Sequence, residues 1–82
     1  MLEKLRNQEK VIGAKQSRRA VRSGQAEVVF LALDADPALT APMEEQCLAS
    51  GVAVVKDFTM HELGQAAGIQ VGAAVATLLK QF

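Results

Sequence analysis

The sequence predicts an α/β fold, a three-layer α/β/α sandwich built on a small four-stranded mixed sheet. Short apolar runs typical of strands alternate along the chain with segments of helical period. One run, EVVFLAL at residues 27–33, is apolar without interruption, which is typical of a strand covered on both faces. The chain has 82 residues, of which 50% are hydrophobic, so residues 1–82 are expected to form one domain.

The first third of the chain contains two predicted helices and two predicted strands. Residues 2–9 are expected to form a short polar helix, and residues 11–13 a brief strand. Residues 14–23 have a helical period, at about 100° per residue, and Gly24 ends that helix. Four small or apolar residues fall on one side of it: Ala14, Ser17, Ala20 and Val21. The strand at residues 27–33 follows.

Two prolines set the predicted start of the longest helix. The motif DADP marks a turn in which Asp36 can cap a helical turn that Pro37 begins. Because proline lacks an N–H, Pro42 is expected only in a helix's first turn. The main helix is therefore predicted to run from near Thr40 to about Ser50.

Caps and short apolar runs delimit the remaining elements. Residues 52–55 are predicted as a strand. Thr59 and Glu62 have the spacing of a capping box, which indicates a helix that ends at Gly68. Residues 73–79, AAVATLL, are predicted as the last strand. Helices would then cover both faces of the sheet.

The composition excludes several classes of protein. The single cysteine, Cys47, cannot form an internal disulfide, and no secretory leader pattern begins the chain, so a cytoplasmic location is expected. No apolar run approaches the about 20 residues that a membrane span needs, so no membrane partner is expected. With three Phe and no Trp or Tyr, a sheet that stacks RNA bases on exposed aromatic rings is disfavoured.

The formal net charge is zero, but the charges are segregated along the chain. Residues 1–24 contain seven Lys and Arg against two Glu, a net charge of +5. Residues 25–82 contain two Lys against seven Asp and Glu, a net charge of −5. Such segregation favours a surface that faces a polyanion.

The basic residues of the predicted helix at 14–23 share one face. Lys15, Arg18, Arg19 and Arg22 fall within a sector of about 100°, opposite the small apolar side. Gly13 would stand at the N-terminal edge, where free N–H groups and the helix dipole favour an anion. Gln16 adds a side chain that can read a base edge. The alternative is an ordinary solvated basic face.

The other reactive side chains favour structural roles. Asp34 and Asp36 are better explained by turns and caps than by a metal site. His61 has no second His or Cys at ligand spacing and is expected on the surface, and Cys47 is expected to be buried. No nucleotide-binding, zinc or nucleophile motif occurs, so the sequence predicts a non-enzyme without cofactor or metal.

Three blocks of the sequence resemble a known family in its order and spacing: IGAKQSRRAVRSG, ALDADP and HELGQAAGIQVGAAV. The chain closely resembles the L7Ae family of ribosomal and ribonucleoprotein components, in particular its short bacterial members, over about residues 11–79. The resemblance implies an α/β/α sandwich that binds kink-turns. These are RNA elements in which a bulge beside tandem sheared G·A pairs bends the helix sharply.

The resemblance also implies which residues bind RNA. The helix tip, Gly13 with Ala14, Lys15 and Gln16, would enter the RNA groove at the sheared pairs, and Arg19 would contact a phosphate. Arg18 and Arg22 complete the basic face. The loop before the last strand would cradle a base flipped out of the bulge, through Ile69, Gln70 and Val71. Archaeal and eukaryotic members have Asn-Glu in place of Lys15-Gln16, whereas Lys-Gln resembles the bacterial branch.

Two other classes of function are alternatives to the binding of kink-turn RNA. The chain could be the RNA-recognition domain of an RNA-modifying enzyme, or a protein-interaction module that uses the acidic residues between 27 and 62. The resemblance favours a monomer that binds kink-turns in ribosomal RNA or in an mRNA leader.

Overall fold

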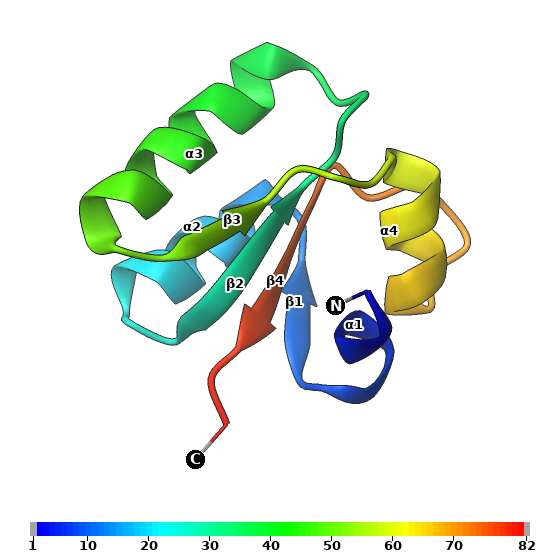
Figure 1. The fold of residues 1–82 in the computed structure, drawn as a ribbon, viewed down its shortest axis with the longest axis horizontal. Helices are drawn as coiled ribbons and strands as arrows, with labels where there is room; N and C mark the ends of the chain where they lie inside the picture. The colour runs from blue at the N-terminus through cyan, green and yellow to red at the C-terminus, as the bar shows by residue number, and fades with distance from the viewer. Residues whose placement is uncertain (1, 82) are drawn as a thin grey trace.

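The computed structural model describes residues 2–81 and contains four helices and four strands (Figure 1). In chain order the elements are α1 (Glu3–Asn7), β1 (Lys10–Ile12), α2 (Ala14–Arg22), β2 (Ala26–Leu31), α3 (Pro37–Ser50), β3 (Ala53–Val55), α4 (Met60–Ala67) and β4 (Val75–Leu79). The strands form one mixed sheet with the order β1-β4-β2-β3. β2 and β3 run parallel, and β4 pairs antiparallel with both β1 and β2.

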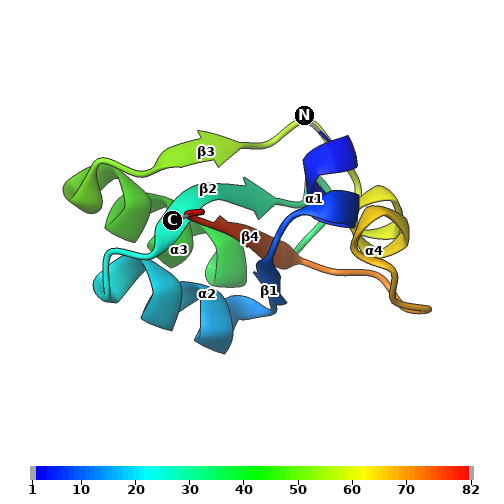
Figure 2. The ribbon, with the colours of Figure 1, turned by 90° about the horizontal axis from the view of Figure 1, so that it is seen from below.

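The helices cover both faces of the sheet. α2 and α3 lie on one side and α1 and α4 on the other (Figure 2). Along β2, Val28 and Phe30 point into the core beneath α1 and α4, whereas Val29 and Leu31 point into the core beneath α2 and α3. This alternation within an apolar strand is what a sheet covered on both faces requires. The prediction of a three-layer sandwich on a four-stranded mixed sheet is confirmed.

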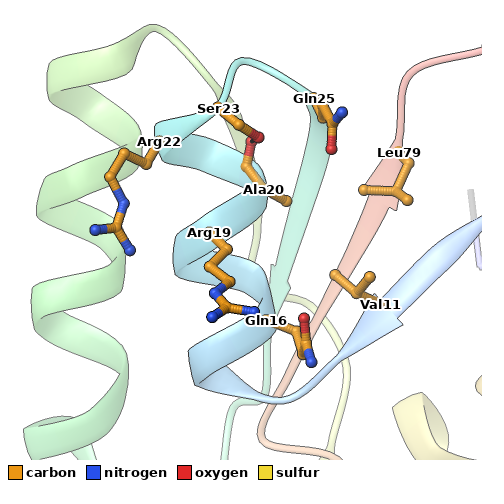
Figure 3. Close-up of a pocket in the computed structure, with 8 residues that line it drawn as sticks. All are labelled: Val11, Gln16, Arg19, Ala20, Arg22, Ser23, Gln25 and Leu79. Carbon is orange, nitrogen blue, oxygen red and sulfur yellow. Dashed lines mark hydrogen bonds between the residues drawn. The ribbon is translucent and has the colours of Figure 1, made fainter.

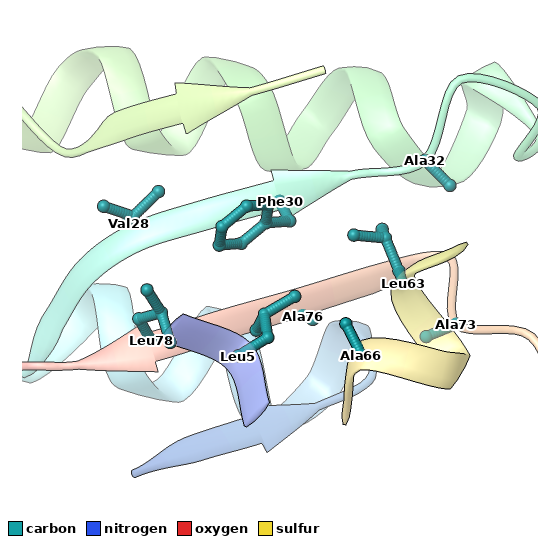
Figure 4. Close-up of a cluster of buried hydrophobic side chains, with 9 residues drawn as sticks. All are labelled: Leu5, Val28, Phe30, Ala32, Leu63, Ala66, Ala73, Ala76 and Leu78. Carbon is teal, nitrogen blue, oxygen red and sulfur yellow. The ribbon is translucent and has the colours of Figure 1, made fainter. Parts of the chain in front are cut away.

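A well-packed cluster of side chains joins the sheet to α1 and α4. Phe30 is completely buried, and its ring centroid lies 6.3 Å from that of Phe58. Leu5 from α1, Leu63 from α4 and Leu78 from β4 are also fully buried in this cluster (Figure 4). The first helix, although short, is therefore held to the domain by a core residue.

The start of α3 differs from the prediction. The helix begins at Pro37 and not near Thr40, because the Asp36 carboxylate accepts a hydrogen bond of 2.9 Å from the Ala38 amide and caps it there. Pro42 consequently lies inside the helix. It is tolerated because Pro42 and Ala38 are exposed, so water can hydrogen-bond the carbonyl that the missing N–H leaves free.

The two long strands are also shorter than predicted. β2 ends at Leu31, and the next residues continue into a loop in which the Leu33 amide donates to the Phe58 carbonyl over 2.8 Å. β4 starts at Val75 and not at residue 73, because the Ala73 amide donates to the Met60 carbonyl over 3.0 Å and ties that part of the chain to α4. Tertiary hydrogen bonds set both limits.

The short elements show smaller differences of the same kind. α1 covers Glu3–Asn7 and not residues 2–9, because Gln8 is already extended. β1 ends one residue early at Ile12, since Gly13 leaves the strand as the N-cap of α2, and β3 begins at Ala53 after a residue that still caps α3. The predicted glycine ends of α2, α3 and α4 and the capping box of α4 are confirmed.

Two contacts hold α2 against β4. The Gly13 amide donates to the Val75 carbonyl over 2.9 Å. In the core, the Thr77 hydroxyl donates to the Ser17 hydroxyl over 2.6 Å, and both side chains are fully buried. A buried polar group is stable only when it is hydrogen-bonded, so this pair fixes α2 in one register on the sheet.

Replacing Ser17 by Ala should lower the free energy of unfolding by about 1–3 kcal/mol, because the Thr77 hydroxyl would lose its acceptor inside the core. The double variant Ser17→Ala, Thr77→Val should recover much of that loss, since it removes both polar groups. Urea denaturation checks both variants. Equal stability of Ser17→Ala and the wild type would contradict this role of the pair.

Candidate nucleic-acid interface

The N-terminal tip of α2 is open to solvent on one side. Gly13 is its N-cap, with φ 99° and ψ 159°, a conformation that side chains disfavour, and no side chain caps the helix. The first intrahelical bond joins the Ser17 amide to the Gly13 carbonyl, so the amides of residues 14–16 have no such partner. Three N–H groups and the positive end of the helix dipole thus remain available to an anion or a base edge.

Four cations line the outer face of α2: Lys15, Arg18, Arg19 and Arg22. All four are exposed, and none of them forms an ion pair with a group in residues 2–81. Elsewhere Lys56 lies 2.7 Å from Glu44, which shows that the chain can pair its charges. The opposite side of α2 is buried through Ser17, Ala20 and Val21, as predicted.

The loop between α4 and β4 divides its predicted site residues between core and surface. Val71 is 72% exposed although its side chain is apolar, and Gln70 is exposed as well. Ile69 is half-buried and packs against the core beneath α4. Gln70 and Val71 therefore lie on the surface, and Ile69 packs beneath them.

The α2 tip and this loop lie at the same end of the sheet (Figure 1). The Gly13 amide donates a hydrogen bond to the carbonyl of Val75, the first residue of β4. The Ala32 amide donates one of 2.9 Å to the neighbouring carbonyl of Ala74. Leu33, which follows, is 62% exposed at this end. Sequence reasoning missed Leu33, because it sits at the end of a continuous apolar run in which nothing distinguishes it.

Two glycines allow the loop to pack tightly on α4. A Cβ atom at Gly64, in the middle of α4, would overlap the Val71 carbonyl oxygen. One at Gly72 would lie 3.1 Å from the Met60 Cβ. The absence of both side chains lets the backbone of residues 71–72 lie directly on the helix, which fixes where the Val71 side chain emerges.

A groove runs along the side of α2, between the helix and the ends of β1 and β4 (Figure 3). It has a volume of about 500 Å³. Its principal lining residues, which together are called the α2 groove below, are Val11, Gln16, Arg19, Arg22, Gln25 and Leu79. No sequence pattern indicates Val11, Gln25 and Leu79 as neighbours, because they come from three separate segments.

The remaining reactive residues have the predicted structural roles. Asp36 caps α3, and the Asp34 carboxylate accepts a hydrogen bond of 2.8 Å from the Met60 amide at the start of α4. His61 is exposed. Cys47 is fully buried, and burial, followed by the charge of Glu44, raises the pKa of its thiol. Within residues 2–81 no three His, Cys, Asp or Glu residues are grouped to hold a metal ion, and none of the helices has the length and hydropathy of a membrane span.

The sandwich and its surface define the chain as a small α/β/α domain in which an uncapped helix tip flanked by cations lies at the same end of the sheet as an exposed loop. Comparison with known families gives the particular group. The model of the ribosomal protein L7Ae/L30e/S12e/Gadd45 family matches residues 1–81, and the chain belongs to this family. The resemblance found in the sequence is thereby confirmed.

Relatives and solved structures agree with this assignment. The RNA-binding protein YbxF of Geobacillus stearothermophilus is 40% identical over 70 residues, 85% of each chain. The large ribosomal subunit protein eL8 of Halobacterium salinarum is 35% identical over 68 residues, 82% of this chain and 57% of that protein. The structure titled Giardia lamblia 15.5kD RNA binding protein superposes with a TM-score of 0.91 at 29% identity, covering 98% of this chain and 71% of that one. These relatives are RNA-binding or ribosomal proteins and not enzymes, which confirms the prediction of a non-enzyme.

A Gly64→Ala variant should displace the loop, because the new methyl group would collide with the Val71 carbonyl. We expect a loss of about 1–3 kcal/mol in the free energy of unfolding, as for other overpacked sites. Amide chemical shifts should change most at residues 70–73. The matched control Gln65→Ala, at the adjacent exposed position of α4, should stay within about 0.5 kcal/mol of the wild type. If Gly64→Ala has wild-type stability and shifts, the loop is not held this way.

Proposed function

We propose that the chain binds kink-turn RNA and stabilises its bent form. The observation that carries this proposal is the placement of the uncapped, cationic tip of α2 at the same end of the sheet as the exposed loop at residues 69–72. The names of the matched relatives, RNA-binding protein and large ribosomal subunit protein, support an RNA ligand. The carrier of the motif, ribosomal RNA or an mRNA leader, stays a prediction, as do the monomeric state and the cytoplasmic location.

The physics of RNA explains why a kinked target suits this surface. The major groove of an undistorted A-form helix is too narrow for protein side chains to read. A sharp kink opens that groove locally and brings phosphates from two arms together. Because crowded phosphates repel each other, a protein that carries unpaired cations binds the bent state better and shifts the population toward it.

The tip of α2 would read the sheared G·A pairs. Gly13 has no side chain, so the backbone can approach the base pairs closely. Gln16 is exposed on the first turn and can both donate to and accept from a base edge. Lys15 and Arg19 lie on the same exposed side and would neutralise phosphates that flank the pairs.

The loop would hold the base that the bulge extrudes. Val71 is exposed, and Leu33 is an exposed apolar side chain at the same end of the sheet. An unstacked base has two apolar faces, which gain from contact with such side chains. Ile69 packs beneath the loop and keeps it rigid, so it acts as support in this proposal.

The alternative of an acidic interaction face is weakened by what the acidic groups do. Asp34 and Asp36 accept amide hydrogen bonds at the starts of α4 and α3, and Glu62 completes the capping box. Glu44 is paired with Lys56. The Glu27 carboxylate accepts a hydrogen bond of 2.6 Å from the side-chain amide of Gln8. Five of the acidic residues between 27 and 62 thus have structural partners, whereas the cations of α2 have no ion-pair partner within residues 2–81.

Fluorescence resonance energy transfer tests the bending activity. With dyes on the two arms of a kink-turn RNA in Mg²⁺-free buffer, where the free RNA is mostly extended, the protein should increase the transfer efficiency. Replacing the sheared G·A pairs by Watson–Crick pairs should weaken binding strongly, because the edges read by the tip are lost. An efficiency that stays constant throughout the titration would refute the proposal.

Arg19→Ala and Gln16→Ala should have different effects. Arg19→Ala should weaken binding to intact and variant motifs alike and reduce the slope of log affinity against log salt by about 1, because it removes a phosphate contact. Gln16→Ala should cost about 1–3 kcal/mol on the intact motif and less on variants, because it removes a base contact. Arg6→Ala on α1, across the sheet from α2, is the matched control and should change neither quantity. Equal losses for Gln16→Ala on intact and G·A-disrupted RNA would show that this residue does not read the bases.

A further inference from the structure

We propose that the α2 groove binds a nucleotide of the RNA strand that continues beyond the kink-turn core. This inference rests on the proposed function and extends its contact surface from the tip of α2 along the side of the helix. The groove is open to solvent at the edge of the sheet, where β1 pairs only with β4. Val11 and Leu79, on the sheet side of the groove, are therefore only half-buried.

The position of the groove makes it continuous with the tip. Gln16 belongs to both surfaces, since it is the third residue of α2 and also lines the groove. From Gln16 to Arg22 the helix rises about 9 Å, at about 1.5 Å per residue. A strand that contacts the tip and follows the helix toward its C-terminus would pass along this groove.

The lining of the groove is complementary to the parts of a nucleotide. Val11 and Leu79 project from β1 and β4 toward α2 and offer an apolar surface to a base (Figure 3). Gln16 and Gln25 stand at the two ends and can pair with base or ribose edges (Figure 3). Arg19 supplies an unpaired guanidinium for phosphate. The volume of about 500 Å³ lies within the range of pockets for small organic ligands, about 300–1,000 Å³.

A neighbouring hollow indicates which way the nucleotide is oriented. Gln25 and Leu79 also border a smaller hollow that is lined by Glu9 and Lys80. The opposite charges of Glu9 and Lys80 offset each other at that end, whereas the arginines attract a phosphate along the helix. The phosphate is therefore placed against α2, beside Arg19, and the base against the strands.

Gln25→Glu is the most informative variant. The Gln25 side chain is exposed and makes no hydrogen bond within residues 2–81, so the change adds a negative charge to the groove without removing a structural contact. Gln25 is also outside the helix tip and the loop. The matched control is Gln65→Glu, the same substitution at an exposed position of α4 on the other side of the sheet.

The test compares a kink-turn RNA whose arms end at the motif with RNAs in which one arm at a time is lengthened. For the wild type, lengthening the arm whose strand would follow α2 into the groove should tighten binding by about tenfold, the effect expected of one charge-assisted hydrogen bond. Gln25→Glu should bind the short RNA like the wild type and lose most of the gain from lengthening. Gln65→Glu should keep the gain.

Two results would overturn this inference, and a titration with free adenosine monophosphate distinguishes two explanations of the first. No gain for the wild type with either arm means that RNA does not enter the groove, while tight binding of the short RNA leaves the proposed function intact. Equal weakening of short and long RNA by Gln25→Glu indicates a general electrostatic effect. If free adenosine monophosphate shifts the methyl signals of Val11 and Leu79 while no gain with arm length is seen, the groove takes a free nucleotide and not the RNA strand. Failure to bind either RNA would instead refute the proposed function itself.

Discussion

The attachment of α2 to β4 is the constraint on which the surface depends. A nine-residue helix would not be stable alone in water, so its position and its existence both come from packing. The buried hydroxyl pair of Ser17 and Thr77 and the bond from the Gly13 amide to Val75 set its register. Because β4 begins directly after the loop from α4, the same attachment brings the helix tip to that loop. Two segments more than fifty residues apart in the sequence thus form one surface.

The fold also explains how a neutral chain presents a basic face. Three carboxylates of the second part of the chain, those of Asp34, Asp36 and Glu62, accept amide hydrogen bonds at helix starts, where they also favour the helix dipole. The cations of α2 lie on the outer side of a helix with no acidic residue in its first turn. These acidic groups therefore stabilise the fold, whereas the basic groups of α2 have no ion-pair partner within residues 2–81 and are available to a polyanion.

Much of this organisation could be predicted from the sequence, since it depends on local patterns. Apolar runs, glycine ends and the capping box of Thr59 and Glu62 indicate the elements, and the period of residues 14–23 predicts the basic face of α2. The start of α3 differs from the prediction because the Asp36 carboxylate caps the helix ahead of Pro42, which the general rule for proline does not take into account. Three relations could not be predicted. Gly64 lies beneath Val71, Leu33 is exposed at the same end of the sheet as the α2 tip, and Val11, Gln25 and Leu79 share a groove. These relations depend on contacts between distant segments, which no local pattern encodes.

The central claim is that the tip of α2 and the loop before β4 act as one binding surface. Its most direct test is a titration of ¹⁵N-labelled protein with a kink-turn RNA, observed through the amide signals of residues 13–16 and 69–72. The account predicts that both sets of signals shift together and saturate at one equivalent of RNA, while the signals of β3, at the far edge of the sheet, do not move. Shifts confined to the arginines of α2, with the loop unchanged at saturation, would contradict it.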